Sequence, residues 1–444
     1  MKEKFMGLLE QNKLGQLRQE IVNMNTVDIA QLLEELDKKY LLIVFRILPK
    51  EISADVFSYV SYDEQRYIIE SITDKEAEHI ISELFLDDTI DFLEEMPSNV
   101  VKKVLKNTDE ETRRLINQFL QYPDESAGSI MTIEYVDLKK EMTIKEALDH
   151  IKKTGVDKET IDTCYVIGKN RILEGTISIR KIILSDEMQL IKDVMSTDVI
   201  YAKTFDDQET IADIFKKYDF ISMPIVDKEK RLVGIVTIDD VVDIIEQENT
   251  EDLQKMAAMQ PSEEEYLRTN VFSLAKNRIM WLLILMISAT FTGNIIRKFE
   301  DVLQSVVVLA SFIPMLMDTG GNAGSQSSTL IIRGLALGEI ELKDILKVLW
   351  KEFRVSLIVA VVLSVVNFLR VYYLEGAEFA ISVTVCLSLF ATVILAKVVG
   401  GVLPIIAKKL KLDPAIMAGP LITTIVDALA LLLYFAMATT FLNI

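Results

Sequence analysis

The chain has 444 residues, more than one compact domain holds, and a net charge of −19. From Asn270 onward, 14 basic and 11 acidic residues nearly balance, so residues 1–269 carry almost all of the negative charge. An acidic surface attracts cations and repels nucleic acid, which argues against a nucleic-acid partner. Two widely separated cysteines and two histidines predict neither a disulfide framework nor a transition-metal centre.

Residues 1–123 are predicted to form an acidic all-α domain. Short apolar patches alternate every 10 to 14 residues with helix start signals such as Pro49-Lys-Glu, Thr73-Asp-Lys-Glu and Pro97-Ser-Asn. Acidic and small polar residues at a helix start accept hydrogen bonds from free backbone N–H groups. The pattern predicts short helices stacked into a superhelix. The N-terminal stretch has no continuous apolar core typical of a signal peptide, so this part is expected in the cytoplasm.

An internal repeat follows. Residues 165–179 align with residues 224–238 at a constant offset of 59, and Met131-Thr132 matches Met195-Ser196 upstream. Each copy predicts a strand, a polar turn, a second strand near a glycine, and a helix. The pattern resembles a tandem pair of CBS domains, an α/β module that senses adenosine nucleotides or metal ions. We place the two copies at residues 124–189 and 190–246.

Residues 239–270 predict a long connecting helix and a polar linker. Five apolar runs beyond it are long enough to cross a bilayer. They are Ile279–Ile296, Val302–Ile332, Val355–Leu374, Phe379–Ala407 and Pro414–Ile444. The chain is therefore expected to be a multi-domain, α-rich protein with a five-helix transmembrane domain over residues 271–444. Basic residues concentrate after the second and fourth runs, which favours a cytoplasmic N-terminus and an external C-terminus.

The second run holds the first candidate for ion chemistry. Pro314 lacks an N–H, Gly320 and Gly321 permit close helix approach or local unwinding, and Asn322 supplies a neutral oxygen. Polar, irregular backbone at membrane depth is tolerated beside protein or a water-filled cavity. The alternative interpretation is a packing seam of small residues.

Asp427, near the middle of the fifth run, is the second candidate. Thr423 and Thr424 precede it by four and three residues and share its helix face. A carboxylate with hydroxyls and water suits a hard cation such as Mg²⁺ or Ca²⁺. The alternative is a structural ion pair with Lys397 in the fourth run.

Paired acids in the first 269 residues are the third candidate. They lie three or four residues apart on predicted helices, where like charges repel and a divalent cation relieves the repulsion. The alternative is a solvated charged face. The pairs are Asp87 with Asp91, Asp240 with Asp243, and Glu248 with Glu251 and Asp252.

The whole chain resembles the MgtE-type magnesium channels of bacteria. The most specific segment runs from Pro314 to Ser327, and the Ser126–Thr132 entry, Asp413-Pro-Ala and the Pro420 to Asp427 pattern are similar too. The resemblance implies a homodimer in membrane lipid, with a pore on its two-fold axis. It implies that Asp427 holds hydrated Mg²⁺ beside Asn322. Gly419, Lys397 and Asp318 depart from the family pattern.

The resemblance also implies that cytoplasmic Mg²⁺ bridges acids of the sensor and closes the pore. The matching acids are Asp55, Asp87, Asp91, Asp207, Glu209, Asp219, Asp240, Asp243, Glu248, Glu251 and Asp252. Some relatives bind ATP between the CBS copies through an arginine–acid pair, where this chain reads Arg180-Lys181.

We therefore predict channel-type, Mg²⁺-selective uptake across the plasma membrane, with no enzymatic activity. The alternatives are a transporter of another divalent cation such as Co²⁺, or a membrane-anchored nucleotide sensor. A pure anchor needs neither Asp427 nor the Gly-Gly-Asn segment.

Overall fold

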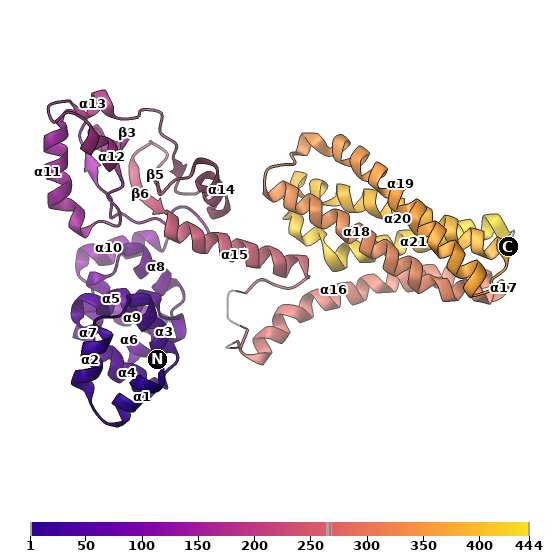
Figure 1. Ribbon diagram of the computed structural model, residues 1–444, viewed down its shortest axis with the longest axis horizontal. Coiled ribbons are helices and arrows are strands. Elements are labelled where there is room, and N and C mark those ends of the chain that lie inside the picture. The colour runs from indigo at the N-terminus through magenta and orange to yellow at the C-terminus, as the bar shows by residue number, and fades with distance from the viewer. Residues whose placement is uncertain (1, 263–265, 268, 443–444) are drawn as a thin grey trace. The chain divides into compact units, whose positions relative to one another are not determined.

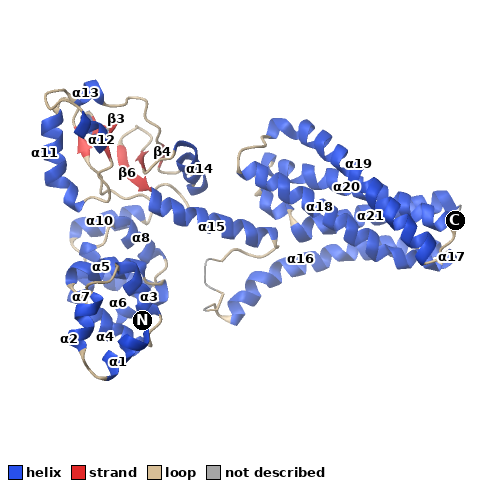
Figure 2. Cartoon of the chain, viewed as in Figure 1, coloured by secondary structure: helices blue, strands red, loops and turns tan. Residues whose placement is uncertain are grey.

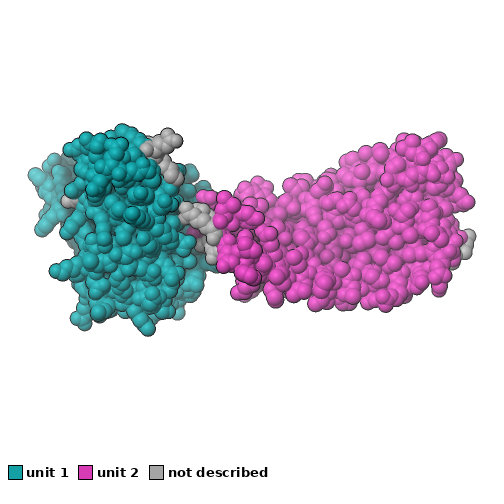
Figure 3. Space-filling model, turned by 90° about the horizontal axis from the view of Figure 1, so that it is seen from below, with its two compact units in different colours: residues 1–245 teal, residues 246–444 magenta. Residues whose placement is uncertain are grey.

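The computed structural model describes all residues except 1, 263–265, 268 and 443–444, and for Lys2, Glu3 and Glu51 only the backbone. The chain forms two compact units, residues 1–245 and 246–444, which Figure 3 colours separately. Each unit has its own buried core.

Short helices fill the first part of unit 1, as the start signals predict. Their bounds are α1 Lys2–Glu10, α2 Leu14–Ile21, α3 Thr26–Glu34, α4 Lys38–Ile47, α5 Lys50–Tyr59, α6 Tyr62–Ser71, α7 Asp74–Glu83, α8 Leu86–Glu94, α9 Ser98–Asn107 and α10 Glu110–Phe119. Helices two apart in sequence pack together, α3 on α5, α5 on α7 and α7 on α9, which makes the expected superhelix (Figure 1).

Local sequence explains where these helices begin. The Thr73 side chain accepts from the Glu76 backbone N–H, and the Glu76 carboxylate accepts from the Thr73 N–H, a complete capping box. Asp109 accepts from the N–H groups of Glu111 and Thr112 in the same way at α10. Each helix buries one apolar stripe, and Phe57 meets Phe92 edge to face across the stack.

The repeat forms two three-stranded sheets with the same topology. The first copy comprises β1 Asp137–Leu138, α11 Ile144–Thr154, β2 Thr163–Ile167, β3 Leu173–Ser178, α12 Ile179–Leu184 and α13 Ile191–Val194. The second comprises β4 Ala202–Lys203, α14 Gln208–Tyr218, β5 Ser222–Val226, β6 Leu232–Thr237 and α15 Ile238–Met256. In each sheet the short strand is parallel to the middle strand, and the last two strands are antiparallel (Figure 2). The strands β5 and β6 repeat β2 and β3 at the predicted offset of 59, including both ends.

The entry segments of the two copies are exchanged. Thr132, at the entry of the first copy, forms an antiparallel bridge with Ile235 in β6, and Ser196, at the entry of the second, bridges Thr176 in β3. This crossing explains the repeat's glycines. A Cβ on Gly234 would lie 2.7 Å from the Thr132 carbonyl oxygen, and one on Gly175 would lie 2.8 Å from that of Ser196.

Unit 2 is all helical within its described residues. Its helices are α16 Val271–Lys298, α17 Glu300–Ser305, α18 Ile313–Ala336, α19 Ile345–Leu369, α20 Phe379–Lys409 and α21 Gly419–Leu442. Short 3₁₀ turns join them at Val307–Phe312 (η3), Leu342–Asp344 (η4) and Pro414–Met417 (η6), and α19 ends in a π turn over Arg370–Leu374 (η5). Helix α18 packs on both α20 and α21, and α19 packs along α20 (Figure 1).

The expected second span, Val302–Ile332, is not one helix. Residues 300–312 form α17 and η3, and the long helix α18 begins only at Ile313. Pro314 sits in the first turn of α18, where a residue has no intrahelical N–H bond to lose. Pro314 therefore starts the helix, and the glycines that follow lie in a continuous helix with no unwinding.

By length and composition, four described helices qualify as membrane-crossing: Val271–Lys298, Leu342–Leu374 (η4 to η5), Phe379–Lys409 and Gly419–Leu442. Helix α18 has 24 residues, but the polar residues of the Gly-Gly-Asn segment lower its hydropathy. Its polar residues, described next, are not spread evenly around the helix.

Candidate functional site

Helix α18 has two distinct faces. Asp318, Asn322 and Gln326 are exposed at four-residue spacing, one turn after the exposed Pro314, so these three form one polar stripe along the helix, which we call the α18 stripe. The small residues point the other way and are buried. These are Gly320, Gly321, Ala323, Gly324, Ser327 and Ser328. The same segment thus provides a packing seam on one face and polar groups on the other.

The glycines belong to the packing seam. A Cβ on Gly320 would lie 2.9 Å from Thr392 Cγ2 of α20, and one on Gly321 would lie 3.0 Å from Thr423 Cγ2 of α21. On the facing helix, a Cβ on Gly400 would lie 2.2 Å from the Gly324 carbonyl oxygen. The structure therefore supports the small-residue packing interpretation for Gly320 and Gly321 and places them away from the exposed polar groups.

Asp427 lies on α21 and is partly exposed. The charged side chain that acts on it electrostatically is Asp318 of the α18 stripe, and Asn322 Nδ2 donates to Asp318 Oδ1 at 3.2 Å. Within the described residues, Asp427 makes no ion pair. Lys397 does not reach Asp427 and instead hydrogen-bonds to Gln326 and Ser327 of α18. The alternative of an Asp427–Lys397 pair is therefore wrong.

The two threonines before Asp427 turn their hydroxyl hydrogens inward. Thr423 Oγ1 and Thr424 Oγ1 donate to the Pro420 carbonyl oxygen at 2.9 and 2.8 Å. Their oxygens keep lone pairs that can accept from water. Carboxylates, an amide and hydroxyls along α18 and α21 form an oxygen-rich set of the kind that binds a hard, hydrated cation.

A second group of acids gathers in unit 1. Asp87, Asp88 and Asp91 lie on α8, Asp239 and Asp240 begin α15, and Glu134 and Glu159 lie in loops of the first repeat copy; we call these seven residues the sensor cluster. Burial, and then the charge of Asp239, raises the pKa of Asp88 to about 6. Burial raises the pKa of Asp240 to about 7. Desolvation and then the charge of Asp240 raise the pKa of Asp91 too.

Glu159 was not among the predicted acids. Burial, followed by the charges of Asp239 and Asp240, raises its pKa to about 7, and its buried Oε2 has no hydrogen-bond partner within the described structure. It stands in a loop, outside any i, i+4 pair, so the helical spacing rule could not find it. Glu134 lies next to it in space, because the Glu159 N–H donates to the Glu134 carbonyl oxygen at 2.9 Å.

The other predicted acids are more dispersed. Asp55, on α5, is exposed and raises the pKa of Asp88. Asp207 caps α14 by accepting from the Glu209 N–H, whereas Asp219 ends the same helix in a left-handed conformation. Since α14 has 11 residues, Asp207 and Asp219 stand roughly 18 Å apart along its axis. Asp243 acts on Asp91 through its charge.

The end of α15 belongs to unit 2 and meets the start of α21. Lys255 Nζ pairs with Glu251 Oε1 at 2.6 Å and with Asp413 Oδ2 at 2.7 Å. Asp413 also caps η6 by accepting from the Ala415 N–H. Gly419 follows with φ +43°, and a Cβ there would lie 2.4 Å from the Met256 carbonyl oxygen.

Two of the predicted acids near this contact differ in their surroundings. Burial and then Asp413 raise the pKa of Asp252, and Glu248 is half-buried one turn earlier on α15. Across the described residues, no three His, Cys, Asp or Glu side chains converge closely enough to hold a bare ion. The acids thus form extended surfaces of charge, which suit a cation that keeps its water shell.

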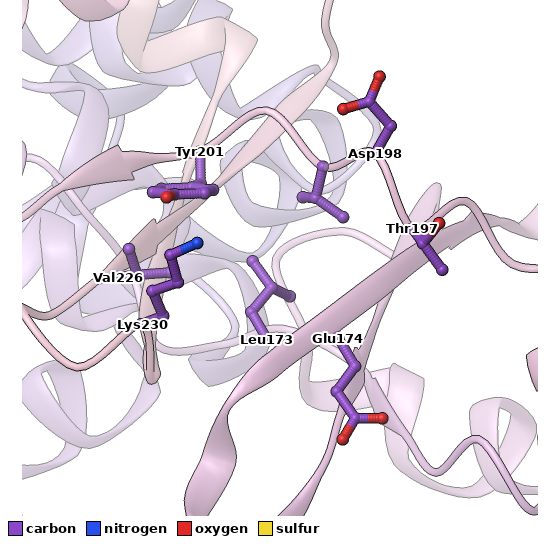
Figure 4. Close-up of a pocket in the computed structure, with 8 residues that line it drawn as sticks. Leu173, Glu174, Thr197, Asp198, Tyr201, Val226 and Lys230 are labelled. Atoms are coloured by element: carbon purple, nitrogen blue, oxygen red, sulfur yellow. The ribbon is translucent and has the colours of Figure 1, made fainter.

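A cavity of about 250 Å³ lies between the two repeat copies. Figure 4 shows Lys230 beside the Tyr201 ring, with Asp198 and Glu174 at the other side of the opening. The Lys230 Nζ lies 5.4 Å from the ring centroid, and Glu174 is paired with Lys140 at 2.8 Å. An aromatic ring and one ammonium fit a nucleotide, whereas two carboxylates oppose its phosphates.

Three family models match parts of the chain: a divalent cation transporter model over residues 313–437, the MgtE intracellular N domain over 24–125, and a CBS domain over 191–247. The magnesium transporter MgtE of Thermus thermophilus is 35% identical over 98% of this chain and 97% of its own length. The Bacillus subtilis magnesium transporter MgtE is 34% identical over 98% and 96%.

A crystal structure of the cytosolic domain of the Mg²⁺ channel MgtE in complex with ATP is similar to unit 1. It has 32% sequence identity and a TM-score of 0.53, and the match covers 55% of this chain and all of that one.

A superhelix, a CBS pair and a bundle of apolar helices around one polar stripe define a membrane transport protein with a regulatory domain. The chain belongs to the MgtE family of divalent-cation transporters.

Proposed function

We propose that this protein is a Mg²⁺ channel that admits the ion down its electrochemical gradient. The observation that carries the proposal is the α18 stripe: exposed polar side chains on a helix inside an otherwise apolar bundle, next to the carboxylate of Asp427. A polar face at membrane depth needs water or a partner. Facing copies of α18 and α21 in a homodimer would enclose both in a pore on the two-fold axis.

The ion passes with its water shell in this proposal. Magnesium dehydrates reluctantly and is usually bound through one or two carboxylates and several waters. Asp427 and Asp318 supply negative charge, Asn322 supplies a neutral oxygen, and neither helix presents a cage of ligands. A cage-free pore favours a small, strongly hydrated divalent ion over Ca²⁺, which takes more direct ligands.

The membrane arrangement follows from the same elements. With α18 counted as a span in addition to the four apolar helices, the basic residues at the cytoplasmic ends orient the N-terminus inward and the C-terminus outward in the plasma membrane. Those residues are Arg333, Lys343, Lys347, Lys351, Arg354, Lys408, Lys409 and Lys411.

The sensor cluster closes the channel when cytoplasmic Mg²⁺ is plentiful. Repulsion among its carboxylates opposes docking of α8 against the start of α15, and a bound divalent ion relieves it. Nucleotide binding in the cavity of Figure 4 would bias the same module, as the ATP complex of the MgtE relative suggests. The protein has a transport role and no catalytic one in this proposal.

Asp427 provides the decisive test. Reconstituted protein should load vesicles with Mg²⁺, measured with an internal fluorescent indicator, and Asp427→Asn should reduce uptake by at least about tenfold because the ion loses its charged contact. Asp301→Asn, on the exposed face of α17, is the matched control and should keep full uptake. Normal uptake by Asp427→Asn would contradict the pore assignment, and faster entry of Co²⁺ than Mg²⁺ would favour the other-cation alternative.

A further inference from the structure

Two ionisable side chains buried in unit 2 have no part in the pore described above. Glu352 of α19 is 8% exposed and Lys397 of α20 is 5% exposed. Buried charges are costly unless they are paired and hydrogen-bonded, so they persist where they do something the fold needs. Glu352 lies outside every motif discussed in the sequence, and Lys397 departs from the family pattern.

Ser327 connects them. Its Oγ donates to Glu352 Oε2 at 2.6 Å, and Lys397 Nζ donates to Ser327 Oγ at 3.4 Å and to Gln326 Oε1 at 3.5 Å. The hydroxyl therefore accepts from a cation and donates to an anion, which joins the two charges across three helices. Both charges are compensated without a direct ion pair within the described residues.

The connection crosses the packing seam of α18. Gly324 lies against Gly400, and a Cβ on Gly401 would lie 3.0 Å from Glu352 Cγ, so the backbones approach closely here. In lipid, helix packing gains little from the hydrophobic effect. Interhelical hydrogen bonds therefore act together with van der Waals packing in holding the rotation of α18 about its axis.

We propose that Lys397, Ser327 and Glu352 are positioning residues that fix the rotation of α18 and so keep the α18 stripe facing the ion path. A shift of one residue around a helix turns a side chain by about 100°. Such a turn would carry Asn322 toward the seam and bring Ala323 out. This proposal rests on the proposed channel function, because it assigns the residues that hold the pore face in place.

Rotation is measured directly by cysteine accessibility in the full-length, reconstituted protein. In a Cys164→Ser/Cys386→Ser background, Asn322→Cys should react quickly with a water-soluble thiosulfonate reagent and Ala323→Cys slowly, because Asn322 is exposed and Ala323 buried. Adding Lys397→Met or Glu352→Gln should lower the ratio of the two rates several-fold. The double variant should keep the low ratio even though it leaves no buried charge uncompensated, since the connection that fixes the rotation is gone.

Magnesium uptake should follow the same pattern. Each single variant should lose roughly tenfold in rate per folded protein, and Lys397→Met/Glu352→Gln should remain as slow. Lys409→Met, exposed in the last turn of the same helix α20, is the matched control and should change neither readout.

An unchanged labelling ratio in both single variants, or a wild-type ratio in the double variant, would overturn the proposal. Labelling does not depend on transport. If the wild-type protein carried no Mg²⁺, the channel proposal would fail while the accessibility ratio still decided the role of these residues.

Discussion

At the scale of single residues, Gly419 shows how one backbone position links two parts of unit 2. Its φ of +43° lies in the region that favours glycine, and the Met256 carbonyl oxygen occupies the space where a side chain would begin. Its departure from the family pattern therefore has a steric reason. The end of α15 can touch the first turn of α21 only because no Cβ stands between them.

Gly419→Ala should lower the thermal stability of unit 2 by more than the conformational cost of a non-glycine residue, about 1 kcal/mol, since it also displaces Met256. Gly338→Ala is the matched control, because Gly338 has φ +69° with nothing within 4 Å of an added Cβ. Thermal unfolding of the two variants in detergent separates the cost of the backbone conformation from the cost of displacing Met256. Equal losses in both would show that the Met256 contact contributes nothing.

At the scale of elements, the end of α15 is joined to η6 by Lys255, whose ammonium pairs with Glu251 on its own helix and Asp413 on the turn before α21. Both hydrogen bonds raise the pKa of Lys255, although its burial works in the other direction, so the ammonium stays charged at any pH of interest. Any shift of α15 along its axis therefore pulls on the turn that leads into the helix carrying Asp427.

Lys255→Met should weaken this link and make closure by Mg²⁺ incomplete. We expect the cytoplasmic Mg²⁺ concentration for half-inhibition to rise several-fold, with little change in maximal uptake, because Lys255 lies outside the α18 stripe. Uptake into vesicles preloaded with graded Mg²⁺ measures this shift. Lys351→Met, exposed on α19, is the control, and the same inhibition curve in both variants would exclude a coupling role for Lys255.

The bounds of helices and strands were predictable where they depend on residues close by in the sequence. The strand bounds follow the repeat offset of 59, and the helix starts of the superhelix follow their caps, as Thr73 and Asp109 illustrate. The start of α18 at Ile313 was not predicted, because a proline interrupts a helix or begins one depending on its position, and composition does not show where the helix starts. The apolar run continued through η3 without a break in hydropathy.

The candidate site was predictable in part. Residue type identified Asp427 and the polar segment, but the division of that segment into the α18 stripe and the glycine seam depends on which face α20 and α21 cover. Glu159 and Glu352 could not be found from spacing, since their partners are distant in sequence: Asp239 and Asp240 for the first, Ser327 for the second.

At the scale of the whole molecule, negative charge is concentrated in unit 1, and repulsion among these charges opposes the compact form of that unit. Burial, and then the charge of neighbouring acids, raises the pKa of Asp88, Glu159 and Asp240, so both effects disfavour the ionised form of the sensor cluster. A ligand that binds the compact form adds stability in proportion to the logarithm of its concentration over its dissociation constant.

Millimolar Mg²⁺ should therefore raise the unfolding temperature of the protein and slow its proteolysis within residues 1–245, whereas K⁺ at equal ionic strength should not. Glu159→Gln should stabilise the Mg²⁺-free protein by about 1 kcal/mol or less, since it removes one partly solvated charge, and should shrink the response to Mg²⁺. Glu141→Gln, at an exposed position, is the control. A response to Mg²⁺ equal to wild type in Glu159→Gln would remove Glu159 from the sensor.

The exchanged entry segments of the repeat have a consequence for synthesis of the protein. Thr132 reaches its bridge with Ile235 only after about 100 further residues have been made, while Ser196 finds Thr176 already present. At ribosomal speeds of about 5–20 residues per second, the entry segment of the first copy remains unpaired for roughly 5–20 s. A nascent chain halted before β6 should thus remain protease-sensitive in the first copy, and the hydrophobic helices of unit 2 emerge only after the repeat can close.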